Sequence, residues 1–130
     1  MRNEKKKLIQ DNLSTLLKKY AKTDVIQSIE REYKAHPTQN INTELIDDNR
    51  YLSKVKLSPK KVDIFAKQLE IDPFIEPLIV RQKQDHYEVI IGRKRLFAAR
   101  QAGIEQVPTL IRNYNDEETL LILLAVARDE

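Results

Sequence analysis

Apolar residues at helical spacing mark the first part of the chain. Ile9 begins one such series, and a second series begins at Ile26, after the residues AKTD. The pattern predicts two amphipathic helices that form a hairpin. Pro37 interrupts it, so we expect an N-terminal helical segment over residues 1–40 and a separate domain over residues 41–130.

The second part alternates between strand and helix patterns. Ser58 is a suitable N-cap, Pro59 suits a first helical position, and Gly103 is placed to end a later helix. The helix from Pro59 is expected to bury Val62, Phe65, Ala66 and Leu69. The other expected elements are a short strand and turn at 42–53, strands from Leu78 and at 86–91, a helix at 93–102, a strand at 107–112 and a helix capped by Asn115 or Asp116. This order predicts an α+β fold with a small mixed sheet and surrounding helices.

The composition narrows the classes of function. The chain has 130 residues, of which 41% are hydrophobic, and this is enough for one domain with a core. It contains no cysteine, which excludes disulfides, thiolate metal sites and cysteine nucleophiles. No apolar run is long enough to span a membrane and no signal-peptide pattern appears, so we expect a cytoplasmic protein without a membrane partner.

Charge is distributed unevenly along the chain. Residues 1–40 contain nine Lys and Arg against five Asp and Glu, a net charge of +4. Residues 81–100 contain six against two, again +4, whereas residues 115–130 contain one against five, or −4. The two basic regions favour an anionic partner, although a solvated basic face is the common alternative.

One basic region contains an unusual helix beginning. Residues 92–95 read Gly-Arg-Lys-Arg where a helix is expected to start. A helix N-terminus carries partial positive charge, so each cation there costs a few tenths to about 1 kcal/mol. The preceding glycine leaves backbone N–H groups open to close approach by an anion. Two hypotheses stay open: an anion binds at this end, or the cations extend into solvent.

The stretches EPLIVRQKQDHYEVIIG and GRKRLFAARQAGIEQVPTLIR resemble, in order and spacing, the N-terminal domain of ParB proteins. These proteins are the chromosome and plasmid partition factors of the ParB/sulfiredoxin-like fold. Their second box reads G-E-R-R-x-R-A-A, and their first box corresponds to NRYLSK at residues 49–54. The resemblance runs from about Asn42 to the end, or about two-thirds of the chain.

The resemblance implies a bacterial, nucleoid-associated protein of the cytoplasm. The family domain binds CTP with magnesium as a switch and closes as a dimeric clamp on DNA, and a ParA-like ATPase is a typical partner. Family members read specific DNA through a helix-turn-helix region after this domain. That region is not recognisable in these 130 residues, so we expect a fragment or a shortened relative with weak DNA binding through its basic regions.

Carried over box by box, the resemblance predicts a nucleotide or phosphate site. Its residues are Gly92, Arg93, Lys94, Arg95, Glu76, Pro77 and Lys54. Arg50 and Tyr51, in the first box, are weaker candidates for the same pocket. Within the second box, Arg93 stands in place of glutamate, while Lys94 and Phe97 stand in place of arginines. Asp47 and Asp48 are interpreted as solvated turn residues.

The family's third box, E-N-x-x-R, would supply a metal-binding glutamate. It should begin near Val126 and Ala127, where this chain has no carboxylate, so Asp129 and Glu130 are the remaining metal-ligand candidates. We therefore expect nucleotide or phosphate binding that needs little magnesium, no efficient hydrolysis and no assignable catalytic residue. CTP hydrolysis at family-like rates stays the alternative implied by the resemblance.

Two other functions share this fold. The first is an enzyme, either a nuclease or a nucleotide-dependent kinase, which would need a general base and usually a metal carboxylate near the phosphate site. The second is a degenerate domain kept for dimer or partner contacts. Sulfiredoxin chemistry is excluded, because it needs a cysteine.

Overall fold

The computed structural model describes residues 27, 31 and 36–126. The predicted helical hairpin therefore falls outside the described residues, apart from Gln27 and Arg31, and so do Asp129 and Glu130. The chain divides into two compact units. One comprises His36–Asn113, and the other comprises Met1–Ala35 with Tyr114–Glu130.

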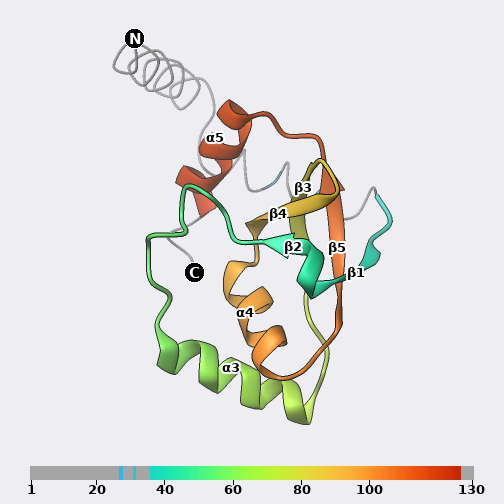
Figure 1. The fold of residues 1–130 in the computed structure, drawn as a ribbon, viewed down its shortest axis with the longest axis vertical. Coiled ribbons are helices and arrows are strands. Elements are labelled where there is room, and N and C mark those ends of the chain that lie inside the picture. The colour runs from blue at the N-terminus through green and yellow to red at the C-terminus, as the bar shows by residue number, and fades with distance from the viewer. Residues whose placement is uncertain (1–26, 28–30, 32–35, 127–130) are drawn as a thin grey trace. The chain divides into compact units, whose positions relative to one another are not determined.

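A five-stranded mixed sheet forms the centre of the 36–113 unit (Figure 1). Its strands follow the order β1-β5-β3-β4-β2 across the sheet. Their bounds are β1 Gln39–Asn42, β2 Ile46–Asp47, β3 Leu78–Lys83, β4 His86–Ile91 and β5 Gln106–Arg112. The hairpin β3–β4 and the edge pair β1–β5 are antiparallel, whereas β3–β5 and β2–β4 are parallel.

Two helices of this unit pack against each other. They are α3, Pro59–Ile71, and α4, Arg93–Gln101, and a short 3-10 turn (η1, Thr43–Leu45) connects β1 with β2. Ser58 caps α3 as predicted, because its side chain accepts a hydrogen bond from the Lys61 N–H at 3.4 Å. Since α4 lies between β4 and β5 in sequence, it provides the crossover that the parallel pair β3–β5 requires.

The other unit contributes helix α5, Asp116–Val126. Asn115 is its cap: its side chain accepts from the Glu118 N–H at 2.8 Å, and the Glu118 carboxylate accepts from the Asn115 N–H at 3.2 Å. This reciprocal arrangement is a capping box, and it agrees with the predicted cap. Although α5 is largely apolar, no helix within the described residues is long and apolar enough to cross a membrane.

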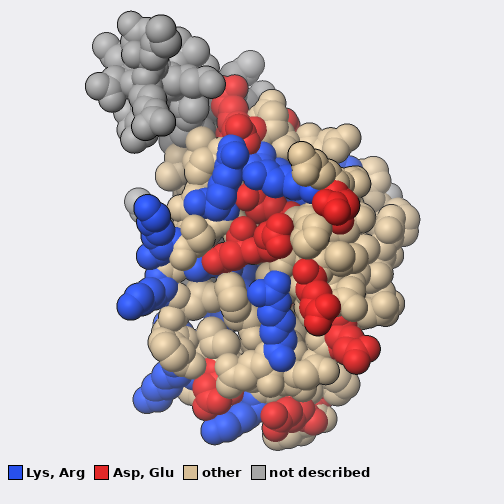
Figure 2. Space-filling model, in the orientation of Figure 1, with Lys and Arg blue, Asp and Glu red and all other residues tan. Residues whose placement is uncertain are grey.

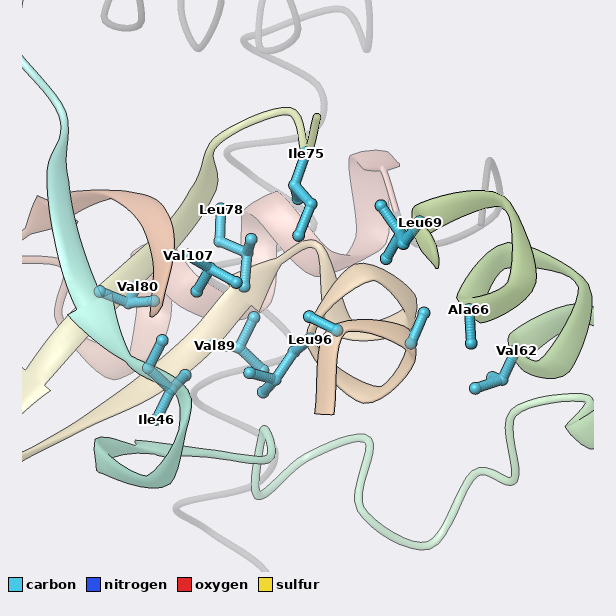
Figure 3. Close-up of a cluster of buried hydrophobic side chains, with 12 residues drawn as sticks. Ile46, Val62, Ala66, Leu69, Ile75, Leu78, Val80, Val89, Leu96 and Val107 are labelled. Carbon is cyan, nitrogen blue, oxygen red and sulfur yellow. The ribbon is translucent and has the colours of Figure 1, made fainter. Parts of the chain in front are cut away.

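Side chains from the sheet, α3 and α4 form the hydrophobic core (Figure 3). Burying one such aliphatic side chain contributes about 1.5–3 kcal/mol. Phe65, which we predicted in the buried stripe of α3, is only partly buried. The core residues are Ile46, Val62, Ala66, Leu69, Ile75, Leu78, Val80, Val89, Leu96, Ala98, Ala99 and Val107.

The first strand lies where the sequence predicted a break between domains. Strand β1 begins at Gln39 and pairs antiparallel with β5, with Gln39 opposite Thr109. Its sequence QNIN has no hydrophobic alternation, because an edge strand exposed at its beginning needs little apolar surface. Pairing with β5 is what makes this segment a strand. The predicted α+β fold with a small mixed sheet is confirmed.

Gly92 joins β4 to α4 in a conformation that favours glycine. Its φ is 102°, in the left-handed region, and a Cβ there would lie 2.9 Å from the Leu78 Cγ. From the sequence, we interpreted this glycine as leaving room for an anion to approach the backbone N–H groups. The structure supplies an internal reason as well, because the turn presses against the buried Leu78 of β3.

Replacing Gly92 with alanine should lower the free energy of unfolding by about 2–4 kcal/mol, since left-handed strain adds to overlap with Leu78. Gly103→Ala is the matched control. Gly103 also has a positive φ, of 76°, but no atom lies within 4 Å of its hypothetical Cβ. The Gly103→Ala variant should therefore lose only about 1–2 kcal/mol of unfolding free energy. Urea unfolding followed by circular dichroism measures both variants. Equal losses in the two variants would contradict the role of Leu78.

Candidate functional site

The beginning of α4 combines uncapped backbone with cationic side chains. The Leu96 N–H donates to the Gly92 carbonyl at 2.9 Å, which is the first bond of the helix. The N–H groups of Arg93, Lys94 and Arg95 have no acceptor inside the helix, and Gly92 provides no side-chain cap. An uncapped N-terminus of this kind attracts anions.

Arg93 already has an anionic partner inside the protein. Its Nε and Nη2 atoms lie 2.7 and 3.1 Å from the two carboxylate oxygens of Asp48, a bidentate pair. The Arg93 side chain is only 8% exposed, so it does not extend into solvent. Asp48, which we had interpreted as a solvated turn residue, instead neutralises the first cation of the helix.

Arg95 meets two other predicted site residues. Its Nη2 atom lies 3.3 Å from a carboxylate oxygen of Glu76, and its Nη1 atom donates to the Pro77 carbonyl at 3.3 Å. The Arg95 side chain is 25% exposed and that of Glu76 is 73% exposed. An ion pair so open to solvent contributes little stability, so another anion can exchange with Glu76.

The remaining predicted residues lie around this point. Lys94 is half-buried, and its ammonium group lies 5.8 Å from the centre of the Phe65 ring. Lys54 is exposed on the loop between β2 and α3. In the same loop, Arg50 donates from its Nη2 to the Tyr51 hydroxyl at 2.6 Å.

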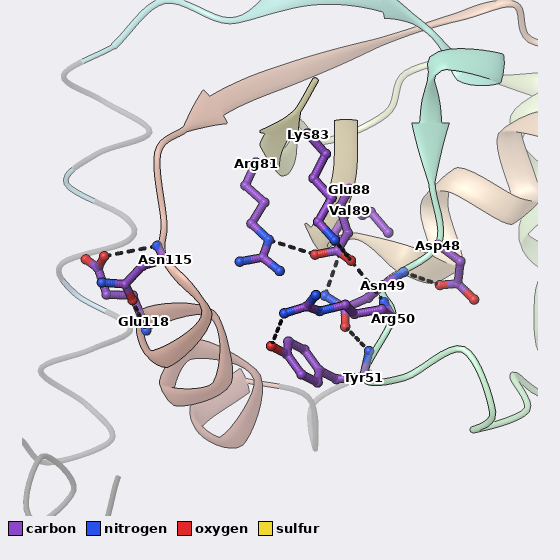
Figure 4. A network of polar contacts seen from close by, with 10 residues as sticks. All are labelled: Asp48, Asn49, Arg50, Tyr51, Arg81, Lys83, Glu88, Val89, Asn115 and Glu118. Atoms are coloured by element: carbon purple, nitrogen blue, oxygen red, sulfur yellow. Dashed lines mark hydrogen bonds and ion pairs between the residues drawn. The ribbon is translucent and has the colours of Figure 1, made fainter. Parts of the chain in front are cut away.

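A buried polar network supports this loop, and sequence reasoning missed it (Figure 4). Arg81 donates from its Nε to a Glu88 carboxylate oxygen at 2.7 Å, and both side chains are at most 5% exposed. The other Glu88 oxygen accepts from the Arg50 backbone N–H at 3.1 Å and lies 3.7 Å from the Lys83 ammonium. Glu88 therefore joins the β3–β4 hairpin to the loop after β2.

Asn49 completes the network from the loop side. Its fully buried side chain donates to the Val89 carbonyl at 3.0 Å and accepts from the Tyr51 N–H at 2.9 Å. Its backbone N–H donates to Asp48 at 2.8 Å. A continuous series of contacts thus leads from the sheet through Asn49 and Asp48 to Arg93 at the beginning of α4.

The sequence did carry a signal for the central pair. The observed hairpin turns at Gln84 and Asp85, one residue later than the turn at 83–85 that the sequence suggested, and this register sets Arg81 opposite Glu88. Opposite charges facing each other on neighbouring strands indicate a cross-strand ion pair. The contact of Glu88 with Arg50, 38 residues away, had no such signal.

A hollow of about 430 Å³ lies beside Arg93. It is lined mainly by apolar groups from one face of α4 and from the segment that leads into α3. The lining residues are Lys56, Leu57, Pro59, Val62, Arg93, Phe97 and Gln101. Phe97 occupies the position where the family box has an arginine, so this wall offers an aromatic ring in place of a phosphate ligand.

Carboxylates near α4 are few and are paired. Asp48 and Glu76 contact arginines, and Glu88 is buried against Arg81. Within residues 36–126, no group of three or more His, Asp or Glu side chains could hold a metal ion. The two metal-ligand candidates from the sequence, Asp129 and Glu130, lie outside the described residues.

Comparison with known proteins assigns the family. The chain belongs to the ParB N-terminal domain family, whose pattern it matches over residues 27–126. A nucleoid occlusion protein of Bacillus cytotoxicus is 34% identical over 102 residues, which cover 78% of this chain. The matched part is 33% of that relative, so the chain spans about a third of its length.

Solved structures show the same fold. The chromosome-partitioning protein ParB of Caulobacter crescentus, complexed with CTP-γ-S, superimposes with a TM-score of 0.63 at 16% identity, covering 72% of this chain and 53% of the other. Sulfiredoxin of Arabidopsis thaliana superimposes with a TM-score of 0.53 at 17% identity, covering 66% of this chain and 96% of the other. At these identities the likeness concerns the fold, and it confirms the predicted ParB/sulfiredoxin-like architecture.

Replacing Glu88 with alanine should lower the free energy of unfolding by about 3–5 kcal/mol, because it removes one member of a buried ion pair and the acceptor of the Arg50 N–H. The exposed pair between Lys67 and Asp63, at 3.1 Å, provides the control. Lys67→Ala should cost less than about 0.5 kcal/mol. Urea unfolding measures the loss in both variants. If Glu88→Ala lost as little stability as Lys67→Ala, the central role of the network would be disproved.

Proposed function

We propose that this chain contains the ligand-binding domain of a ParB-like DNA partition or nucleoid-associated protein. Its ligand is a nucleoside triphosphate such as CTP, or another phosphate compound, that binds as a switch at the beginning of α4. Membership of the ParB N-terminal domain family supports this function. So do the nucleoid occlusion relative and the fold shared with a ParB complexed with CTP-γ-S.

The exchangeable pairing of Arg95 carries the proposal. A phosphate bears more charge than a carboxylate and can accept hydrogen bonds from the free N–H groups at this end of α4. Glu76, which is largely exposed, can turn into solvent when the phosphate takes its place. Arg95 would then bind the phosphate while the Pro77 carbonyl keeps its guanidinium in position.

The other predicted residues take separate roles in this proposal. Gly92 forms the turn, and Lys94 adds a second accessible charge. Arg93 keeps its partner Asp48 and contributes its backbone N–H. Lys54 would approach from the loop between β2 and α3. Arg95 and Lys94 are the two cations that would hold the phosphate group. The family box has an arginine where this chain has Phe97, so one further phosphate contact is missing here.

The wider role of the protein is also proposed. We also propose the division into residues 1–40 and 41–130, which rests on the break at Pro37. A dimeric clamp, weak association with DNA, a ParA-like ATPase partner and a nucleoid location in the cytoplasm follow from the family. These properties belong to whole ParB-like proteins, of which this chain spans a part.

A degenerate domain kept for dimer or partner contacts is the second candidate. It is favoured by one observation: Asp48 and Glu76 already balance two of the three cations at the beginning of α4. In that case nucleotides would not bind at all. The calorimetric experiment below separates the two candidates.

Arg95→Ala should reduce nucleotide affinity by about tenfold or more, because it removes a charge-assisted contact of about 1.5–3 kcal/mol. Isothermal titration of the 130-residue chain with CTP, ATP and pyrophosphate measures the effect. Arg31→Ala, which removes an exposed arginine outside the 36–113 unit, should leave the affinity unchanged. Full affinity in Arg95→Ala would exclude the site, and no binding by the unmodified chain would support the degenerate domain.

Magnesium should have little effect on this binding, and turnover should be negligible. Asp48 and Glu76, at the beginning of α4, are paired with arginines, and two cations can partly neutralise the phosphates in place of a metal. The measurement is calorimetry with magnesium or with chelator, together with phosphate release in the presence and absence of DNA. Hydrolysis that a chelator abolishes would overturn the prediction and favour an enzyme with Asp129 or Glu130 as metal ligand.

A further inference from the structure

A second cationic surface lies on the segment that joins β2 to α3. Residues 50–61 read RYLSKVKLSPKK, and no acidic residue occurs between Asp48 and Asp63. The five cations of this stretch, here called the basic segment, all have exposed side chains. They are Arg50, Lys54, Lys56, Lys60 and Lys61.

The lysines of the basic segment are not neutralised within the described part of the chain. Lys54, Lys56, Lys60 and Lys61 form no ion pair there. Elsewhere in the 36–113 unit, cations at comparable exposure do have partners, as in the pair of Lys67 with Asp63. The lysine charges of the basic segment are therefore available to an external anion.

These charges form a row instead of converging on one point. Figure 2 shows Lys and Arg side chains following the left margin of this face, over the loop that precedes α3 and over the beginning of that helix. A single phosphate would need cations gathered around one position. A row of separated point charges instead suits a polymer with regularly repeated negative charge.

The backbone of the basic segment is held at both ends. At its beginning, the Arg50 N–H donates to the buried Glu88, and two turn bonds follow, Leu52 N–H to Asn49 O at 3.1 Å and Val55 N–H to Leu52 O at 2.8 Å. At its end, Ser58 caps α3. Because the folded protein already presents the lysines, binding need not pay the full cost of ordering the loop.

We propose that the basic segment binds the phosphate backbone of double-stranded DNA without reading its sequence. Protein–protein interfaces are poor in lysine and rich in aromatic anchors, whereas interfaces with DNA are strongly positive. Stable binding to an anionic membrane usually combines basic charge with apolar side chains that insert, and Val55 is the one large hydrophobic of the segment that is clearly exposed. This inference rests on the proposed function only in taking DNA as the polyanion, and Lys56, Lys60 and Lys61 take no part in the proposed α4 site.

The test compares two variants of the 130-residue chain that lose the same charge. One is Lys56→Gln with Lys60→Gln and Lys61→Gln, in the basic segment. The other is Lys5→Gln with Lys6→Gln and Lys7→Gln, in the basic N-terminal stretch. Lys54 stays unchanged because it is also proposed for the phosphate site. Fluorescence anisotropy with two unrelated DNA duplexes at several salt concentrations measures affinity and its salt dependence.

Removing three phosphate contacts should weaken binding at low salt by about tenfold or more and reduce the logarithmic salt slope by about 2–3, equally for both duplexes. The N-terminal variant should lose clearly less affinity than this, because the proposal assigns the main phosphate contacts to the basic segment and a smaller share to the basic region at residues 1–40. Equal losses in both variants would overturn the proposal, because net charge alone would explain them. So would undiminished DNA binding in the first variant, or no DNA binding by the unmodified chain.

Two further measurements separate this surface from the other possibilities. Nucleotide titration of the basic-segment variant should match the unmodified chain, which distinguishes failure of this proposal from failure of the α4 site. Vesicles of anionic phospholipid serve as the competing polyanion. If the variant lost vesicle binding but kept DNA binding, the surface would be a membrane contact and the proposal would be wrong.

Discussion

The arrangement of the 36–113 unit depends on one buried carboxylate, that of Glu88. Taking an ionised group out of water is costly unless it is paired and fully hydrogen-bonded. Glu88 meets this requirement with Arg81 on the neighbouring strand and with the backbone N–H of Arg50 in the loop after β2. One side chain therefore joins two parts of the chain that are almost forty residues apart in sequence. Moving the loop would remove a backbone hydrogen bond from this buried carboxylate.

The geometry of the candidate site depends on this network. Asn49, held against β4, places Asp48 beside Arg93, and Gly92 fits closely against Leu78. The positive charge of Arg93, Lys94 and Arg95 at the helix N-terminus is therefore largely balanced by the protein's own carboxylates. Arg95 can still exchange its partner, because Glu76 faces solvent.

Cations of this domain thus fall into two groups with different consequences. Arg93 and Arg95, at the beginning of α4, contact carboxylates, so a ligand bound by either must compete with an internal anion. The lysines of the basic segment lack such partners within the described residues, so they can meet a polyanion without displacing anything. The domain therefore presents two cationic surfaces, one with internal carboxylate partners and one without them among the described residues.

The sequence alone determined the order and type of most elements, because hydrophobic periodicity, Ser58, Gly103 and the cap at Asn115 act locally. It also determined the family, since the motif around Gly92 combines spacing and residue type. Only the tertiary structure decided which anions face the cations of α4, because Asp48 and Arg93 are 45 residues apart and no local pattern links them. The same holds for strand β1, whose polar sequence becomes a strand by pairing with β5. Local preferences act between near neighbours, whereas charge pairing and edge pairing depend on where the whole fold brings distant segments together.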